Sequence, residues 1–250
     1  MSGHSKWSTI KRQKGAADAK RGAVFTKLSR EIILAAKQGG GDTSTNFRLR
    51  LAVQRAKAAN MPNDNIERAI AKATGTGADG EQLDEMTYEG YGPGGTAILV
   101  AVLTDNKNRT VSEVRHQFSR AGGNLGENGS VAWQFDAKGL ITVPVNGSDA
   151  DDIALQAIDA GAEDVDISGE MIEVQTEPSD LEAVRKALES SGLEIENADF
   201  AMVPKVMVDL DERTAHQALK LLDALEDLED VQRVYSNANF SDEAIESYAG

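Results

Sequence analysis

The sequence predicts an α+β protein, in which an N-terminal three-helix domain is followed by two α/β modules, one inserted in the other. Apolar residues recur at helical spacing between Gly22 and Thr74. Strand and helix patterns then alternate from Met86 to Ser236. The length of 250 residues is sufficient for two or three separate hydrophobic cores.

The N-terminal domain is expected to contain three amphipathic helices. The glycine run 39–41 ends the first, Asn46 can cap the second, and Asn63 or Asp64 can cap the third. The predicted helices begin near residues 22, 46 and 63 and end near residues 38, 60 and 74. A glycine-rich connector at 74–80 separates them from the rest of the chain.

Residues 139–203 form a complete series of strand, helix, strand, strand, helix and strand. This βαββαβ order is that of a ferredoxin-like unit. Its predicted elements are 140–145, 149–160, 165–168, 171–176, 179–190 and 193–202, with Ser179-x-x-Glu182 as a capping box at the second helix.

The segments on either side are expected to combine into a second ferredoxin-like βαββαβ module. The first half would be a strand at 96–104, a helix starting at the capping box Thr110-x-x-Glu113 and a strand at 130–135; a further strand at 86–91 precedes it. The second half would be a strand at 206–210, a helix at 212–227 and a strand at 231–236. The resulting division is a basic tail (1–21), a helical domain (22–78), an α/β module (79–137 plus 204–240) and an inserted α/β module (138–203).

Charge is segregated along the chain. Residues 1–75 hold 15 Lys and Arg against 5 Asp and Glu, whereas the remainder holds 11 against 36. A cationic end attracts polyanions, and an acidic remainder repels them. This polarity favours nucleic acid as a ligand of the N-terminal part; ion pairing of a basic domain with its own acidic body is the alternative.

The candidate nucleic-acid-binding residues lie in three groups. In the tail, the Trp7 indole could stack on an unpaired base while the neighbouring cations bind phosphates; docking of Trp7 in the protein's own core is the alternative. The tail group is Lys6, Trp7, Lys11, Arg12, Lys14, Lys20 and Arg21. The helical-domain group is Lys27, Arg30, Arg48, Arg50, Arg55 and Lys57. The third group, Arg109, Arg115 and Arg120, lies on the helix of the first α/β module, where a solvated helix face is the alternative.

The sequence predicts no catalytic residue, no cofactor and no metal site. The three histidines have no second ligand at metal-binding spacing, and the absence of cysteine excludes disulfides and thiolate chemistry. The glycine-rich stretch 91–96 lacks the Gly-Lys-Ser/Thr ending of a phosphate loop and lies between strands, which favours a hairpin turn. No apolar run is long enough for a membrane span, and no secretory signal is evident, so we expect a cytoplasmic protein.

Several of these segments together resemble the YebC family of regulatory proteins. The tail motif is Gly3-His4-Ser5-Lys6-Trp7-x-x-Ile10-Lys11, and the helical-domain motif is Asn60-Met61-Pro62-x-x-Asn65-Ile66-x-Arg68. The motifs of the first α/β module are Tyr88-Glu89-Gly90-Tyr91-Gly92-Pro93-Gly94-Gly95, Thr104-Asp105-Asn106-x-Asn108-Arg109-Thr110 and Gly122-Gly123-Asn124-Leu125. The resemblance is dense to about residue 135 and continues beyond it mainly as element order.

The resemblance implies three domains and a non-enzymatic role. It implies either a probable DNA-binding transcriptional regulator or a translation factor on the ribosome that relieves stalling at proline-rich stretches. Acidic modules that repel a long duplex and a Trp-bearing tail favour folded RNA, whereas the role of the family favours DNA, so both polymers stay open. Two other hypotheses are an enzyme with a small substrate near Gly92–Gly95 and a scaffold whose acidic modules dock a basic protein.

Overall fold

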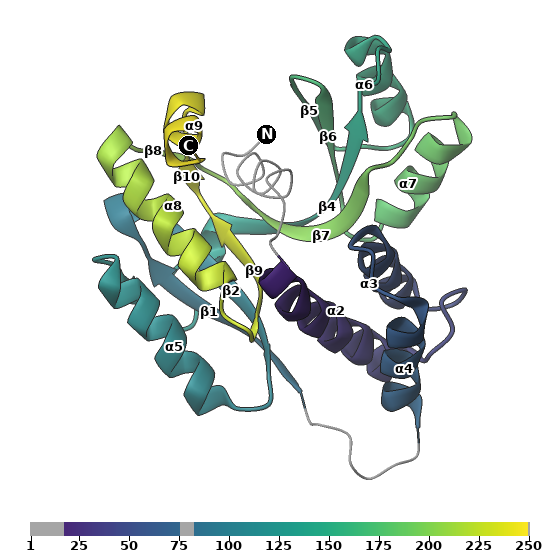
Figure 1. The fold of residues 1–250 in the computed structure, drawn as a ribbon. Helices are drawn as coiled ribbons and strands as arrows, with labels where there is room; N and C mark the ends of the chain where they lie inside the picture. The colour runs from purple at the N-terminus through teal and green to yellow at the C-terminus, as the bar shows by residue number, and fades with distance from the viewer. Residues whose placement is uncertain (1–17, 76–82, 250) are drawn as a thin grey trace.

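The structure is a computed structural model that describes residues 18–75 and 83–249 (Figure 1). It combines a helical head with two α/β modules, which confirms the predicted fold class. The predicted division of the chain at residues 21, 78, 137 and 203 stays a prediction. Among the described residues, no helix is both long and apolar enough to cross a membrane.

The head consists of α2 (Asp18–Gly39), α3 (Phe47–Ala58) and α4 (Asn63–Thr74). Asn46 caps α3 as predicted: its side chain accepts the Leu49 N–H at 3.0 Å and donates to the carbonyls of Ala35 and Gly40 at 2.8 Å. This amide therefore ties the end of α2 to the start of α3. The predicted cap of α4 was wrong, because Pro62 occupies the N-cap position and Asn63 already lies in the first turn.

The inserted module is the ferredoxin-like unit that the sequence predicts. Its four strands pair antiparallel in the order β5-β6-β4-β7, and its core combines Ile141, Ile153, Ile172 and Leu181. Its elements are β4 (Phe135–Pro144), α6 (Ala150–Asp159), β5 (Asp164–Ser168), β6 (Met171–Thr176), α7 (Leu181–Ser190) and β7 (Asn197–Pro204). The predicted capping box at α7 was wrong, since Asp180 holds the N-cap position and the Ser179 hydroxyl donates to its side chain.

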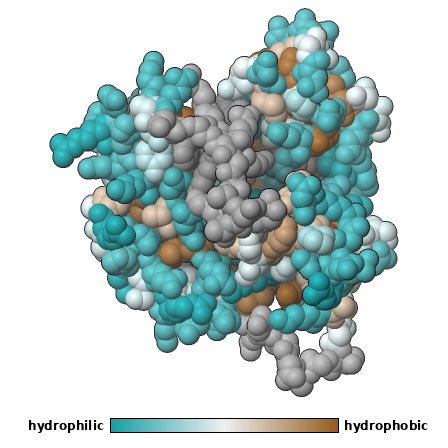
Figure 2. All heavy atoms as spheres, in the orientation of Figure 1, coloured by the Kyte–Doolittle hydropathy of each residue, from teal (hydrophilic) through white to brown (hydrophobic). Residues whose placement is uncertain are grey.

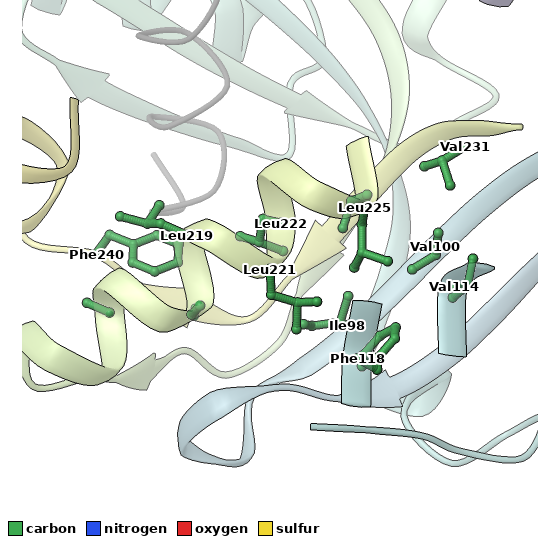
Figure 3. Packing of buried hydrophobic residues seen from close by; sticks show 14 of the residues in the cluster. Ile98, Val100, Val114, Phe118, Leu219, Leu221, Leu222, Leu225, Val231 and Phe240 are labelled. Atoms are coloured by element: carbon green, nitrogen blue, oxygen red, sulfur yellow. The ribbon is translucent and has the colours of Figure 1, made fainter. Parts of the chain in front are cut away.

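The first module contains a four-stranded sheet in the order β3-β1-β2-β9, with α5 and α8 on one face (Figure 1). Figure 3 shows side chains from both helices meeting strand residues such as Ile98 and Val100. The elements are β1 (Asp84–Tyr91), a 3-10 turn η1 (Pro93–Gly95), β2 (Ala97–Thr104), α5 (Lys107–Arg120), β3 (Asn124–Leu125), a 3-10 turn η2 (Ala132–Gln134), α8 (Glu212–Glu226) and β9 (Val231–Ser236). The stretch 91–96 is a hairpin connection, as predicted.

This sheet differs from the predicted one in three elements. The strand after α5 is β3, whereas half of the predicted strand 130–135 lies in η2 and only Phe135 lies in a strand, β4. Only β8 (Val208–Asp209) forms in the predicted strand 206–210, and it pairs with β10 (Ala238–Asn239) outside the four-stranded sheet. In a ferredoxin-like sheet the strand at 206–210 would lie beside β2 in the centre of the sheet. In the structure β1 occupies that position. A helix α9 (Asp242–Ala249) follows β10.

The three parts are joined by apolar contacts. Leu51 of α3 is buried in the core of the inserted module, and the Phe47 ring meets the Phe200 ring edge-on with centroids 6.1 Å apart. Phe135, at the start of β4, packs with Leu99 of β2 and Met202 of β7. The paired β4 and β7 therefore extend from the core of the inserted module to the first sheet.

Candidate nucleic-acid interface

Part of the predicted interface lies outside the described residues. Lys6, Trp7, Lys11, Arg12 and Lys14 belong to residues 1–17. Lys20 and Arg21 fall within α2, but their side chains are likewise outside the described ones. The other predicted cations all lie among the described residues.

Arg30 of α2 is engaged with the loop between α8 and β9. Its guanidinium lies 2.8 Å from the Asp230 carboxylate and 2.9 Å from that of Glu229, and its side chain is only 14% exposed. Lys27, one turn earlier, donates to the backbone carbonyl of Glu226 at the end of α8. This face of α2 therefore holds the head against the first module.

Asp230 also binds the N-terminus of α5. Its buried carboxylate lies 2.7 Å from Arg109 and accepts the Thr110 hydroxyl at 2.6 Å and the Thr104 hydroxyl at 3.1 Å. Burial by itself would raise the pKa of Asp230, but these hydrogen bonds and the Arg109 charge hold that pKa below its usual value. Asp230 is thus an ionised buried carboxylate shared by α2, α5 and β2.

The capping box predicted at Thr110 was wrong, because Thr110 lies inside α5 and its hydroxyl binds other groups. The helix begins three residues earlier, and the Asn106 side chain caps it by accepting the Arg109 N–H at 3.1 Å. The Thr110 hydroxyl is instead used by Asp230 and by the Asn106 carbonyl.

Arg55 of α3 lies in a second ionic cluster, where the head and both modules meet. Its guanidinium pairs with Glu31 of α2 and, at 2.9 Å, with Asp199 of β7. Arg233 of β9 pairs with the same two carboxylates, at 3.3 Å and 2.5 Å. Burial, followed by the charge of Asp199, raises the pKa of the neighbouring Tyr235 well above its usual value.

Two further head arginines pair with acids of the modules. Arg50 lies 2.9 Å from Glu182 of α7, with both side chains about a quarter exposed. Arg48 lies 2.6 Å from Glu85 of β1, where both side chains are open to solvent. Arg30, Arg48, Arg50, Arg55 and Arg109 are therefore all partnered by carboxylates of this chain.

Three predicted cations make no ion pair with the described residues. Lys57 is exposed on α3, and Arg115 and Arg120 are exposed on α5, Arg120 away from the buried Val114 and Phe118 and Arg115 beside them. His116 is exposed beside Arg115. Figure 1 places α3 and α5 on different sides of α2, so Lys57 does not join the α5 cations in one patch. These side chains are available to an external anion.

The motif around Glu89 builds the loop that precedes η2. The Glu89 carboxylate accepts backbone N–H groups of Gly129 at 2.6 Å and of Val131 and Ala132 at 2.8 Å. Burial by itself would raise the pKa of Glu89, but the three donors lower it below 4.5. The Tyr91 hydroxyl donates to the Ser130 carbonyl at 2.9 Å. This motif therefore orders the 126–132 loop.

Sequence reasoning missed the acids that engage the arginines. Asp230, Asp199 and Glu31 lie far apart in the chain and in no shared motif, so local spacing carries no signal for them. For Asp199 and Asp230 the only available signal was the excess of acidic residues beyond residue 75, and for Glu31 there was none. Among the described residues, no His, Cys, Asp and Glu side chains cluster in a way that could hold a metal ion.

Comparisons with known proteins give one consistent relationship. The family model described as "TACO1/YebC second and third domain" matches residues 83–238, and "TACO1/YebC protein N-terminal domain" matches residues 5–76. A "probable transcriptional regulatory protein" of Dehalococcoides mccartyi is 58% identical over 99% of this chain and 98% of its own length. One from Rubrobacter xylanophilus is 54% identical over the full length of both.

A solved structure shows the same architecture. The crystal structure of a conserved hypothetical protein from Aquifex aeolicus matches with a TM-score of 0.83 and 47% sequence identity. The match covers 90% of this chain and 93% of that one.

Proposed function

Because the chain belongs to the TACO1/YebC family, we propose that it is a non-enzymatic regulator of gene expression that acts by binding nucleic acid. Family relatives that are named probable transcriptional regulatory proteins support the regulatory role. The observation that carries the nucleic-acid contact is the pair of exposed cations on α5, Arg115 and Arg120, which no described carboxylate neutralises. The cationic tail would supply the other contact.

The paired arginines have a different part in this proposal. Arg30, Arg55 and Arg109 hold the head to the modules, so phosphate would have to displace a carboxylate that is already well placed. Arg48 is the most open of the four ion-paired arginines of the head, because it and Glu85 are both solvated. The tail, Arg115 and Arg120 therefore form the principal proposed contact, Lys57 forms a separate one, and the paired arginines position the head.

The experiment is a salt titration of binding to labelled duplex DNA and to a labelled RNA hairpin with an unpaired loop. Each phosphate contact contributes about −0.9 to the slope of log affinity against log salt on duplex DNA. Reversing Arg115 and Arg120 to Glu should weaken binding and make that slope shallower by about 2. The matched control reverses Arg213 and Lys220 to Glu, which changes the net charge equally on exposed positions of α8.

The two variants separate a contact from a general charge effect. Equal losses in both would mean that net charge alone controls affinity and would remove α5 from the interface. Reversing Lys6, Lys11, Arg12 and Lys14 to Glu tests the tail in the same assay. Unchanged affinity in that variant would remove the tail as an anchor.

The same two labelled ligands test whether the protein binds DNA or RNA. Stacking of an unpaired base on Trp7 would contribute about 1–3 kcal/mol. Trp7→Ala should then weaken binding to the RNA loop more than to duplex DNA, whereas a regulator that grips duplex DNA by phosphates alone would lose little on either. Crosslinking in cells, followed by identification of the recovered polymer, distinguishes chromosomal DNA from ribosomal RNA.

A further inference from the structure

The helix α6 of the inserted module presents an apolar face to solvent. Leu155 and Ile158, about one turn apart, are 61% and 56% exposed. Ile153 and Ala157 of the same helix are buried in the module core. At 100° per residue, Leu155 points almost directly away from those two side chains. Within the described chain, this outer face has no packing partner.

Unpaired carboxylates surround this apolar pair. Asp151 and Asp159 lie four residues before and after Leu155, so all three share one face, and Asp152 lies beside them. All three aspartates are exposed, and none forms an ion pair with a described residue. The face therefore combines aliphatic side chains with negative charge that has no internal counter-charge.

The rest of the inserted module offers no cation to neutralise this face. Residues 138–203 hold 16 Asp and Glu against 3 Lys and Arg, a net charge of −13. Each of the three cations pairs with a glutamate elsewhere: Lys138 with Glu163 at 2.6 Å, Arg185 with Glu189 at 2.7 Å, and Lys186 with Glu182 at 2.8 Å. Any positive charge that neutralises the aspartates of α6 would therefore have to come from outside the module.

The neighbouring edge strand carries a further exposed aliphatic side chain. Ile167 of β5 is 43% exposed and pairs with Ile172, which is buried in the core beneath α6. Paired residues of adjacent strands point to the same face of a sheet, so Ile167 lies on the α6 side. Figure 2 shows hydrophobic surface among hydrophilic residues where Figure 1 places α6.

We propose that this face of α6, centred on Leu155 and Ile158, docks a basic amphipathic segment of a partner protein. Aliphatic side chains of the segment would cover Leu155 and Ile158, and its Lys or Arg side chains would meet Asp151, Asp152 and Asp159. Nucleic acid does not fit here, because a module of net charge −13 repels phosphate. The inference is independent of which cations bind nucleic acid.

The test uses the full chain and a labelled helical peptide of lysine and leucine with its leucines on one face. A second peptide of the same composition distributes the leucines around the helix. Binding is measured by fluorescence anisotropy for the wild-type chain and the double variant Leu155→Ser/Ile158→Ser. The matched control is Val206→Ser, which removes an aliphatic side chain that is 71% exposed in the loop after β7.

We expect the amphipathic peptide to bind the double variant about tenfold or more weakly than wild type, from the loss of two buried aliphatic contacts. Val206→Ser should leave its binding unchanged. Changing Asp151, Asp152 and Asp159 to Asn should weaken binding and flatten its salt dependence. Circular dichroism spectra should not change, since all substituted side chains are exposed.

Three results would overturn the proposal. One is equal binding of the two peptides, which would indicate unspecific attraction to an acidic protein. Another is binding of a labelled RNA or DNA oligonucleotide to the full chain that Leu155→Ser/Ile158→Ser weakens and Val206→Ser does not. The third is a wild-type dimer in sedimentation that Leu155→Ser/Ile158→Ser converts to monomer, because a second copy would then be the occupant.

Discussion

The carboxylate of Asp230, on the loop before β9, lies 2.8 Å from the guanidinium of Arg30 on α2, two hundred residues away in the chain. The same carboxylate binds Arg109 at the start of α5. One buried acid therefore fixes the head, the first module and the N-terminus of a helix that carries exposed cations. The geometry of the proposed interface depends on this contact.

Asp230→Asn should lower the free energy of unfolding by about 2–4 kcal/mol, because two arginines and two hydroxyl groups lose a buried ionised acceptor. Urea denaturation measures the effect. The control is Asp105→Asn, which removes the other, exposed partner of Arg109 and should cost at most about 1 kcal/mol. Equal costs for the two variants would show that burial of Asp230 contributes nothing.

The cluster around Asp199 should respond cooperatively. Arg55 and Arg233 share Asp199 and Glu31, so either arginine can partly support both carboxylates when the other is lost. A double-mutant cycle of Arg55→Met and Arg233→Met should give a coupling energy of about 0.5–3 kcal/mol. The exposed pair Arg48 and Glu85 provides the comparison, with an expected coupling of about 0.2–1 kcal/mol. Strict additivity at Arg55 and Arg233 would contradict a shared cluster.

Glu89 should contribute to acid sensitivity. Because its pKa in the folded chain lies below 4.5, its usual value, its stabilising contribution is complete above that pH and is lost as the pH falls through the folded pKa. Urea midpoints measured from neutral pH to below 4.5 should fall less steeply for Glu89→Gln than for wild type. Glu127→Gln, an exposed change in the loop that Glu89 orders, should follow the wild-type curve.

Gly90 should not tolerate a side chain. A Cβ there would lie 2.6 Å from Phe118 Cε1 and 2.8 Å from the Asn124 carbonyl oxygen, and the second atom belongs to the backbone of β3. Gly90→Ala should therefore cost about 1–3 kcal/mol in thermal or urea unfolding. Gly22→Ala, in α2 with nothing within 4 Å of the new Cβ, should instead stabilise by about 0.5–1 kcal/mol. A neutral Gly90→Ala would mean that β3 can move.

The elements predicted correctly are those with strong local patterns. The inserted module has alternating strands and amphipathic helices in one continuous run, and the structure confirms its βαββαβ order. Asn46 caps α3 because an N-cap is set by residues within one turn. The predicted strand at 130–135 failed because Glu89, about forty residues earlier, binds the amides of Gly129, Val131 and Ala132 and holds this stretch as a loop and a turn.

The sequence alone determined the family, the fold class, the segregation of charge and the positions of the cations. The tertiary structure decided which of those cations remain open to a ligand. Arg55 and Arg120 look alike in the sequence, yet one lies between Glu31 and Asp199 and the other has no described acid beside it. The physical reason is that an ion pair depends on a few ångströms of separation, which only the packing of distant segments sets.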